Sequence, residues 1–146
     1  MKILLDANIL VRAAMSPGGP AAGVLELIHS GKHELVCSSL LVDETRRILG
    51  DARLRQYHGL TDSAIAEFIE SVAAMATYIV VPASVPRIVP LDPLDDHVVF
   101  AAEAAGAEVI CTRDRHLLAA EVLARSAKRG LRVVDDLRLL AELRAD

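Results

Sequence analysis

The sequence predicts an α/β protein: a three-layer α/β/α sandwich around a mostly parallel central sheet of about five strands. Two observations favour this class. Short apolar runs alternate with longer amphipathic segments along the chain, a pattern typical of parallel sheets with helices on both faces. The 146 residues, 53% hydrophobic and 25% charged, suit one globular core, so we expect a single domain over residues 1–146.

The first predicted strand begins at the N-terminus and ends at an acid. Ile3, Leu4 and Leu5 precede Asp6, and an uninterrupted apolar run is typical of a strand buried on both faces. Asp6 is then at the carboxyl end of the strand, where ligands collect in open α/β sheets. The alternative is that Asp6 only caps the helix that follows.

Apolar periodicity and chain-breaking residues predict the other elements in order. Glycine and proline interrupt the chain at residues 16–20, and four prolines mark residues 82–93 as an irregular connection. Gly106 is expected to end a helix, and Asp135 or Asp136 to cap the last one. Helices are expected over residues 9–15, 21–30, 38–50, 61–76, 92–105, 115–129 and 135–144, a short helix or turn over 51–60, and strands over 35–37, 78–81, 107–111 and 131–134.

A second candidate acid lies on the helix expected over residues 38–50. Glu44 has the spacing to share a helical face with Leu41 and Ile48, whereas Asp43 falls on a solvated face. A carboxylate on an apolar face requires a partner or a metal ion, because burying it alone is very costly. Glu44 is therefore the functional candidate, against the alternative that it merely favours helix formation.

Three aspartates open the helix after the irregular connection. Asp92 suits the N-cap, and Asp95 suits the first turn, where an acid stabilises the helix dipole. Asp96 has no such explanation, and its i+3 and i+4 neighbours are apolar. We therefore expect Asp96 to face inward.

Asp114 follows the strand over residues 107–111, so four acids are expected at one edge of the sheet: Asp6, Glu44, Asp96 and Asp114. Unpaired carboxylates in one pocket repel each other, and a hard divalent cation resolves that repulsion. Oxygen ligands without a His/Cys cluster favour Mg²⁺ or Mn²⁺ over Zn²⁺. The five histidines lack metal-ligand spacing and are expected to be incidental.

The candidate acids belong to four short motifs, which are Asp6-Ala7-Asn8 after the first strand, Ser38 with Glu44 six positions on, Asp96 before Ala101-Ala102, and Thr112-Arg113-Asp114. In their order and spacing, these motifs resemble the PIN-domain ribonucleases. The loop over residues 16–20, together with Leu117 and Leu118, resembles the branch that contains toxins of toxin–antitoxin systems.

The resemblance implies a PIN-like fold and a metal-dependent ribonuclease. It implies that the four acids bind one or two Mg²⁺ or Mn²⁺ ions and direct water onto an RNA phosphodiester, and that the chain forms a homodimer neutralised by a small antitoxin protein. Asp92 and Asp95 stay open as alternatives to Asp96. The residues expected to orient the acids or contact the substrate are Asn8, Ser38, Thr112 and Arg113.

Other function classes remain as alternatives. The same acids would serve housekeeping RNA processing. A phosphoacceptor domain needs paired acids near the first strand and a late lysine, and a phosphatase of the haloacid-dehalogenase type needs an aspartate where Asn8 stands. A degenerate binding module is disfavoured because all four acids are present.

Composition excludes further classes. The net charge of −4 argues against nucleic-acid binding by bulk electrostatics alone, although a bound metal changes the local sign. Few aromatic residues argue against a base-stacking platform. No apolar run reaches the ~18 residues of a membrane span, and no signal peptide precedes the first strand. We therefore expect a cytoplasmic protein without a membrane partner, in which Cys37 and Cys111 are reduced and buried.

Overall fold

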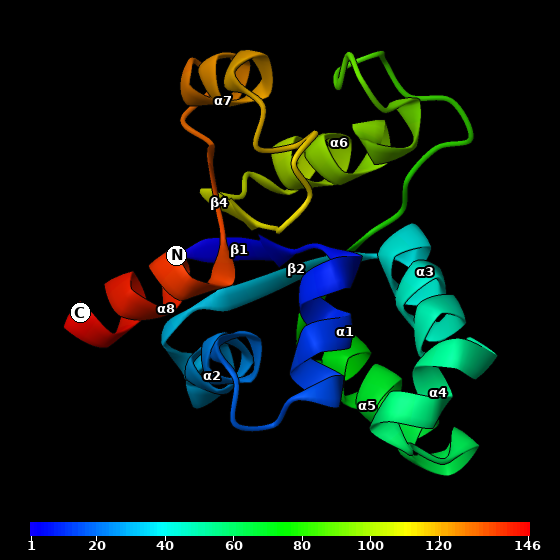
Figure 1. Ribbon diagram of the computed structural model, residues 1–146. Coiled ribbons are helices and arrows are strands. Elements are labelled where there is room, and N and C mark those ends of the chain that lie inside the picture. The colour runs from blue at the N-terminus through cyan, green and yellow to red at the C-terminus, as the bar shows by residue number, and fades with distance from the viewer.

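A computed structural model describes residues 1–146 and contains an α/β fold around a five-stranded sheet (Figure 1). The strand order is β3-β2-β1-β4-β5, and every neighbouring pair is parallel. The predicted fold class is therefore confirmed. The strands are β1 (Lys2–Leu5), β2 (Glu34–Ser38), β3 (Ala76–Ile79), β4 (Val109–Cys111) and β5 (Arg132–Val134).

Helices cover both faces of the sheet, as Figure 1 shows. Helices α1, α2, α3 and α5 lie on one side, and α6 and α7 lie on the other. The last helix, α8, packs against α2. None of the helices combines the length and apolar character that a bilayer crossing requires. The helices are α1 (Ala7–Met15), α2 (Pro20–Leu27), α3 (Ser39–Leu49), α4 (Ala52–His58), α5 (Asp62–Met75), α6 (Asp96–Ala105), α7 (Ala120–Ala127) and α8 (Asp136–Ala145), with a π-turn at Ile28–Lys32 and a 3₁₀ turn at Pro93–Asp95.

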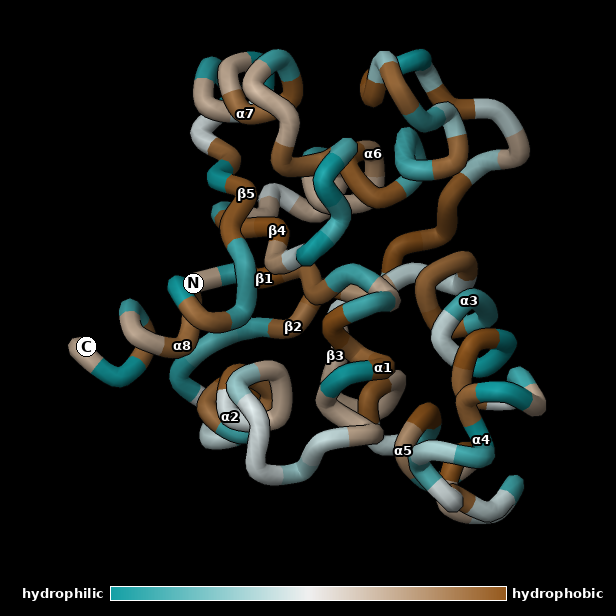
Figure 2. Tube along the Cα trace, viewed as in Figure 1, coloured by the Kyte–Doolittle hydropathy of each residue, from teal (hydrophilic) through white to brown (hydrophobic).

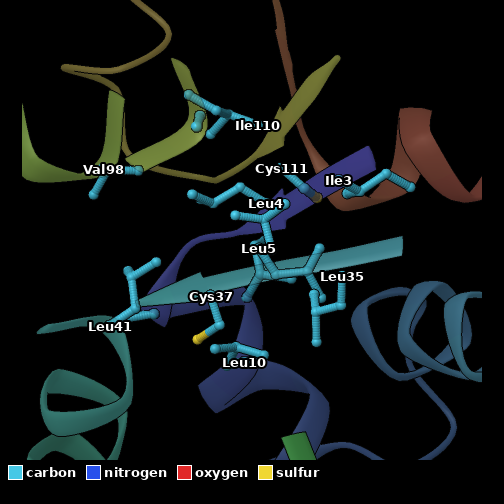
Figure 3. Close-up of a cluster of buried hydrophobic side chains, with 14 of the residues drawn as sticks. Ile3, Leu4, Leu5, Leu10, Leu35, Cys37, Leu41, Val98, Ile110 and Cys111 are labelled. Carbon is cyan, nitrogen blue, oxygen red and sulfur yellow. The ribbon is translucent and has the colours of Figure 1, made fainter. Parts of the chain in front are cut away.

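The core surrounds the central strands on both faces. Strand β1 is buried from Ile3 to Leu5, which explains its uninterrupted apolar run, and Figure 2 shows the inner strands coloured mainly as hydrophobic. In Figure 3, Leu10 and Cys37 lie on one side of these strands, and Val98 and Ile110 lie on the other. Each fully buried leucine or isoleucine contributes about 1.5–3 kcal/mol, so these two layers hold the sheet edge in place.

Among the predicted elements, the largest differences from the structure are in a strand and in a helix. Strand β3 begins and ends two residues earlier than expected, so Val80 is exposed beyond its end. The helix expected over residues 115–129 is confined to α7, and residues 115–119 form turns and a bend instead. Asp114 explains the second difference, because its Oδ1 atom accepts the backbone N–H of His116. Such local bonds compete with helix formation.

Polar side chains begin several helices, as the sequence predicts. Asp6 caps α1, Ser38 caps α3, and Asp135 rather than Asp136 caps α8. Gly106 follows α6 with a φ of 66°, a left-handed conformation that favours glycine.

The strand order creates a switch point at the centre of the sheet. From β1 the chain continues to β2 and β3 on one side, and it then returns to β4 and β5 on the other. Ligands bind at such points in α/β sheets, beyond the carboxyl ends of the strands. The segments that follow β1 and β4 begin with Asp6 and Thr112, so both meet at this switch point.

Candidate metal centre

Asp6 lies at the base of the switch point and is almost completely buried. Its Oδ1 atom accepts the backbone N–H of Ala7 at 2.8 Å, and its Oδ2 atom accepts the Thr112 hydroxyl at 2.7 Å and the Asn8 amide at 3.1 Å. Burial raises the pKa of the Asp6 carboxyl, the bonds from Thr112 and Ala7 lower it, and the charges of Glu44 and Asp114 raise it further. Asp6 is thus both a helix cap and a member of an acidic group.

Thr112 and Asn8 connect the ends of β1 and β4. Besides donating to Asp6, the Thr112 hydroxyl oxygen accepts bonds from the Asn8 amide at 3.2 Å and from the backbone N–H of Asp114 at 3.0 Å. The Asn8 Oδ1 atom accepts the backbone N–H of Arg113 at 3.1 Å. These hydrogen bonds fix the position of Asp6 relative to Asp114 across the switch point.

Asp114 also converges with three further side chains beside this network. One ligand atom from each of Asp92, Asp95, Asp114 and His116 lies within 4.8 Å of the others. The Nδ1 atom of His116 is 3.5 Å from Asp92 Oδ2 and 3.6 Å from Asp114 Oδ1. All four side chains are half-buried, so they are shielded from bulk water yet remain accessible.

Asp95 is the most perturbed acid of the group. Burial, a hydrogen bond and charge from Asp114, and the charges of Asp92 and Asp6 raise the pKa of Asp95 to about 8. Its Oδ2 atom is buried without a hydrogen-bond partner. A buried carboxylate oxygen with no donor, among like charges, is an arrangement that a cation or a proton relieves.

Glu44 joins the same electrostatic group from α3. Burial raises the pKa of the Glu44 carboxyl and Arg47 lowers it, while the charges of Asp114 and Asp92 raise it again. Its neighbour Asp43 is exposed and pairs with Arg46. Glu44 is thus half-buried and Asp43 exposed, the difference that the helical spacing predicts, although Glu44 does not belong to the group of four converging side chains.

Asp96 lies elsewhere, which differs from the sequence-based expectation. It does face inward, but its Oδ1 atom accepts the backbone N–H groups of Ile88 at 3.0 Å and Val89 at 2.7 Å, and its Oδ2 atom pairs with Arg87. Burial works to raise the pKa of Asp96, yet these three donors together hold it below its usual value. Asp96 therefore links the irregular connection to α6 through hydrogen bonds. Asp95, rather than Asp96, lies close to Asp114.

Two other predicted residues have structural contacts. The Ser38 hydroxyl is fully buried and accepts the backbone N–H of Leu41, which fixes the start of the helix that carries Glu44. The Arg113 side chain bonds to Asp136 at 2.6 Å. The backbone of Arg113 touches the Asn8 network, but its guanidinium group is bound to the start of α8.

Sequence reasoning missed His116, and it gave Asp92 a capping role while leaving it open as an alternative to Asp96. Asp92 does cap the 3₁₀ turn through the N–H of Leu94, but it also lies beside His116. The expectation that all histidines are incidental therefore fails for His116. A weak signal existed, because His116 follows Asp114 by two residues in a segment that leaves a strand.

The donor set fits a hard or borderline divalent cation. Carboxylate oxygens predominate, as Mg²⁺ and Mn²⁺ prefer, and one imidazole adds a nitrogen that Mn²⁺ accepts more readily than Mg²⁺. The unpartnered Asp95 oxygen is the particular observation in favour of a bound cation. The geometry thus supports a divalent-metal site formed by Asp92, Asp95, Asp114 and His116.

Comparison with known proteins assigns the family. The profile of the PIN domain matches residues 2–116, so the chain belongs to the PIN-domain family. A search of curated proteins gives no significant match.

Three solved structures share the fold. PAE2754 from Pyrobaculum aerophilum is 24% identical with a TM-score of 0.59, over 100% of this chain and 91% of that one. VapBC2 from Rickettsia felis, bound to a DNA fragment from its promoter, is 15% identical with a TM-score of 0.54, over 92% and 98%. The PilT N-terminus domain protein SSO1118 from Sulfolobus solfataricus P2 is 12% identical with a TM-score of 0.54, over 98% and 93%.

Proposed function

We propose that this protein is a divalent-metal-dependent ribonuclease that hydrolyses RNA phosphodiester bonds with Mg²⁺ or Mn²⁺. The observation that carries the proposal is the pair Asp95 and Asp114, in which a buried oxygen without a donor lies among like charges. Membership of the PIN-domain family supports it. The proposed ligand set is Asp6, Glu44, Asp95 and Asp114, together with Asp92 and His116, which converge with Asp95 and Asp114.

In this proposal each residue has a distinct task. The carboxylates would hold a divalent ion, which would supply positive charge to the phosphate and lower the pKa of the attacking water. Asp6 is kept in orientation by the hydrogen bonds from Thr112 and Asn8. Asp96 belongs to the supporting structure rather than to the ligand set.

Cleavage of a labelled RNA tests the proposal. Structured and single-stranded RNA are incubated with the protein in Mg²⁺, Mn²⁺ or EDTA, and the Asp6→Asn and Glu44→Gln variants are compared with wild type. Asp43→Asn is the matched control, because Asp43 is the exposed neighbour of Glu44. We expect metal-dependent cleavage that both site variants lose and the control keeps. Equal cleavage in EDTA, or full activity in Asp6→Asn, contradicts the proposal.

We further propose that the protein is the toxin of a toxin–antitoxin pair, acts in the cytoplasm as a homodimer, and is neutralised by a small antitoxin protein. Similarity to the VapBC2 structure supports this part. Induced expression in a bacterial host is expected to arrest growth, and Asp6→Asn to abolish the arrest. Growth without arrest, combined with RNA cleavage in vitro, would favour the alternative of a housekeeping RNA-processing nuclease. Light scattering measures the oligomeric state directly.

A further inference from the structure

A buried acid outside the metal centre contacts two segments that form it. Asp136 is the first residue of α8, and its side chain is completely shielded from solvent. Helix capping does not explain this burial, because the preceding residue, Asp135, provides the cap. An ionised carboxylate in such a place requires charged partners.

The two partners of Asp136 come from opposite sides of the switch point. Its Oδ1 atom accepts the Nε–H of Arg113 at 2.6 Å, and its Oδ2 atom lies 3.5 Å from the Nε atom of Arg12. Arg113 stands between Thr112 and Asp114 in the segment after β4. Arg12 lies on α1, the helix that Asp6 caps. One carboxylate therefore contacts the segment that carries Asp114 and the helix that Asp6 caps.

Arg113 is held at two points. Its backbone N–H donates to Asn8 Oδ1, and its guanidinium group donates to Asp136. Because Arg113 lies between Thr112 and Asp114 in the chain, its orientation determines where these two residues lie. The same ion pair directs the guanidinium group toward α8, and without Asp136 this cation would be free to pair with the acids of the centre.

We propose that Asp136 is a positioning residue for the metal centre. It fixes Arg113, and through Arg113 the Thr112–Asp114 segment, while it engages Arg12 and so steadies α1. The inference rests on the proposed function only where it concerns metal affinity. The effect of Asp136 on the order of the Thr112–Asp114 segment does not depend on the proposed function.

The Asp136→Asn variant tests this role, because it removes the charge and preserves the shape. Glu142→Gln is the matched control: Glu142 also lies on α8 and pairs with two arginines, Arg132 and Arg138, but contacts no residue of the centre. Arg113→Lys is a second variant that keeps the positive charge and loses the Nε donor. Circular dichroism establishes that each variant is folded.

Two readouts separate positioning from general stability. We expect Asp136→Asn and Arg113→Lys to weaken Mn²⁺ affinity by about 10–100-fold, the usual effect of losing a residue that orients metal ligands. We also expect faster hydrogen exchange at the amides of Arg113 and Asp114, with unchanged exchange in β2. Glu142→Gln is expected to match wild type in both readouts.

Each other outcome decides the question. Wild-type Mn²⁺ affinity in folded Asp136→Asn and Arg113→Lys overturns the proposal, even if stability falls. If Asp136→Asn does not fold, Arg113→Lys alone decides. If wild type binds no Mn²⁺, the proposed function fails, and the exchange rates alone decide whether Asp136 orders the segment.

Discussion

Asp95 and Asp96 are neighbours in the sequence, but their carboxylates contact different parts of the molecule. Asp95 faces Asp114, with one oxygen left without a donor. Asp96 accepts the backbone N–H of Val89 at 2.7 Å and pairs with Arg87. Asp95 is the last residue of the 3₁₀ turn at Pro93–Asp95, whereas Asp96 is the first residue of α6, so the two side chains belong to different elements. We therefore expect a substitution of Asp95 to affect mainly metal binding and a substitution of Asp96 to affect mainly stability.

Asp95→Asn is expected to lose most Mn²⁺ affinity and keep a stable fold. Asp96→Asn is expected to keep the ligand groups but to lower the free energy of unfolding by about 1.5–3 kcal/mol, because hydrogen bonds to a buried charge are weakened. Isothermal titration with Mn²⁺ and urea unfolding measure the two effects. Loss of Mn²⁺ binding in folded Asp96→Asn, with normal binding in Asp95→Asn, contradicts the division.

The stability of the metal-free protein is expected to fall as pH rises from 5 to 8. The folded-state pKa of Asp95 is raised to about 8, against about 3.9 in an unfolded chain. Its favourable contribution is therefore complete below pH ~4 and is lost as pH rises through about 8. The raised pKa values of Asp6 and Glu44 act in the same direction.

Urea unfolding in EDTA at several pH values measures this slope. Asp95→Asn cannot ionise and is expected to flatten the slope, whereas the Asp43→Asn control keeps it. Saturating Mn²⁺ is expected to restore stability at pH 8, because the ion replaces the lost protons. A metal-free protein that becomes more stable from pH 5 to pH 8 would be inconsistent with the raised pKa values.

Thr112 is expected to act through Asp6. Thr112→Val preserves the shape but removes the hydroxyl that donates to Asp6 and accepts from Asn8. We expect about 10–100-fold weaker Mn²⁺ affinity and a loss of about 1–3 kcal/mol in stability, because three bonding partners lose the hydroxyl. Thr112→Ser is expected to restore both. Failure of serine to restore binding would show that packing of the methyl group, rather than the hydroxyl, matters.

Both cysteines are expected to be unreactive in the native state. Cys37 and Cys111 are free and buried, as the sequence predicts. Burial raises the pKa of Cys37 to about 11 and raises that of Cys111 as well. Because the thiolate is the reactive form, a thiol reagent should label both residues only after unfolding. Rapid labelling of the native protein would reveal an opening of the core that the structure lacks.

The sequence predicts the parts of this protein that depend on local pattern. The apolar run before Asp6, the strand before Thr112 and the phase of Glu44 each indicate a place in the fold, and the alternation of elements indicates the parallel sheet. These features are predictable because a strand buried on both faces requires an uninterrupted apolar run, and a helix with one buried face requires apolar residues at helical spacing.

The remainder depends on how distant segments meet. Helix phase alone favours Asp96, because the folding of residues 88 and 89 back onto it is not visible in the pattern. His116 lies in the centre because the fold brings Asp92, 24 residues away in the sequence, beside it and Asp114. The pairing of Arg113 with Asp136 spans 23 residues. Such contacts follow from tertiary packing and leave no local signal.

Binding of Mn²⁺ to wild-type protein tests the proposed centre most directly. Titration calorimetry at pH 7.5, after dialysis against EDTA and then metal-free buffer, measures affinity and stoichiometry, with Asp95→Asn and Asp43→Asn in parallel. We expect one or two ions per chain in wild type and in Asp43→Asn, with binding reduced by at least about tenfold in Asp95→Asn. Absence of saturable Mn²⁺ binding by folded wild-type protein would contradict the metal centre, and with it the proposed ribonuclease mechanism.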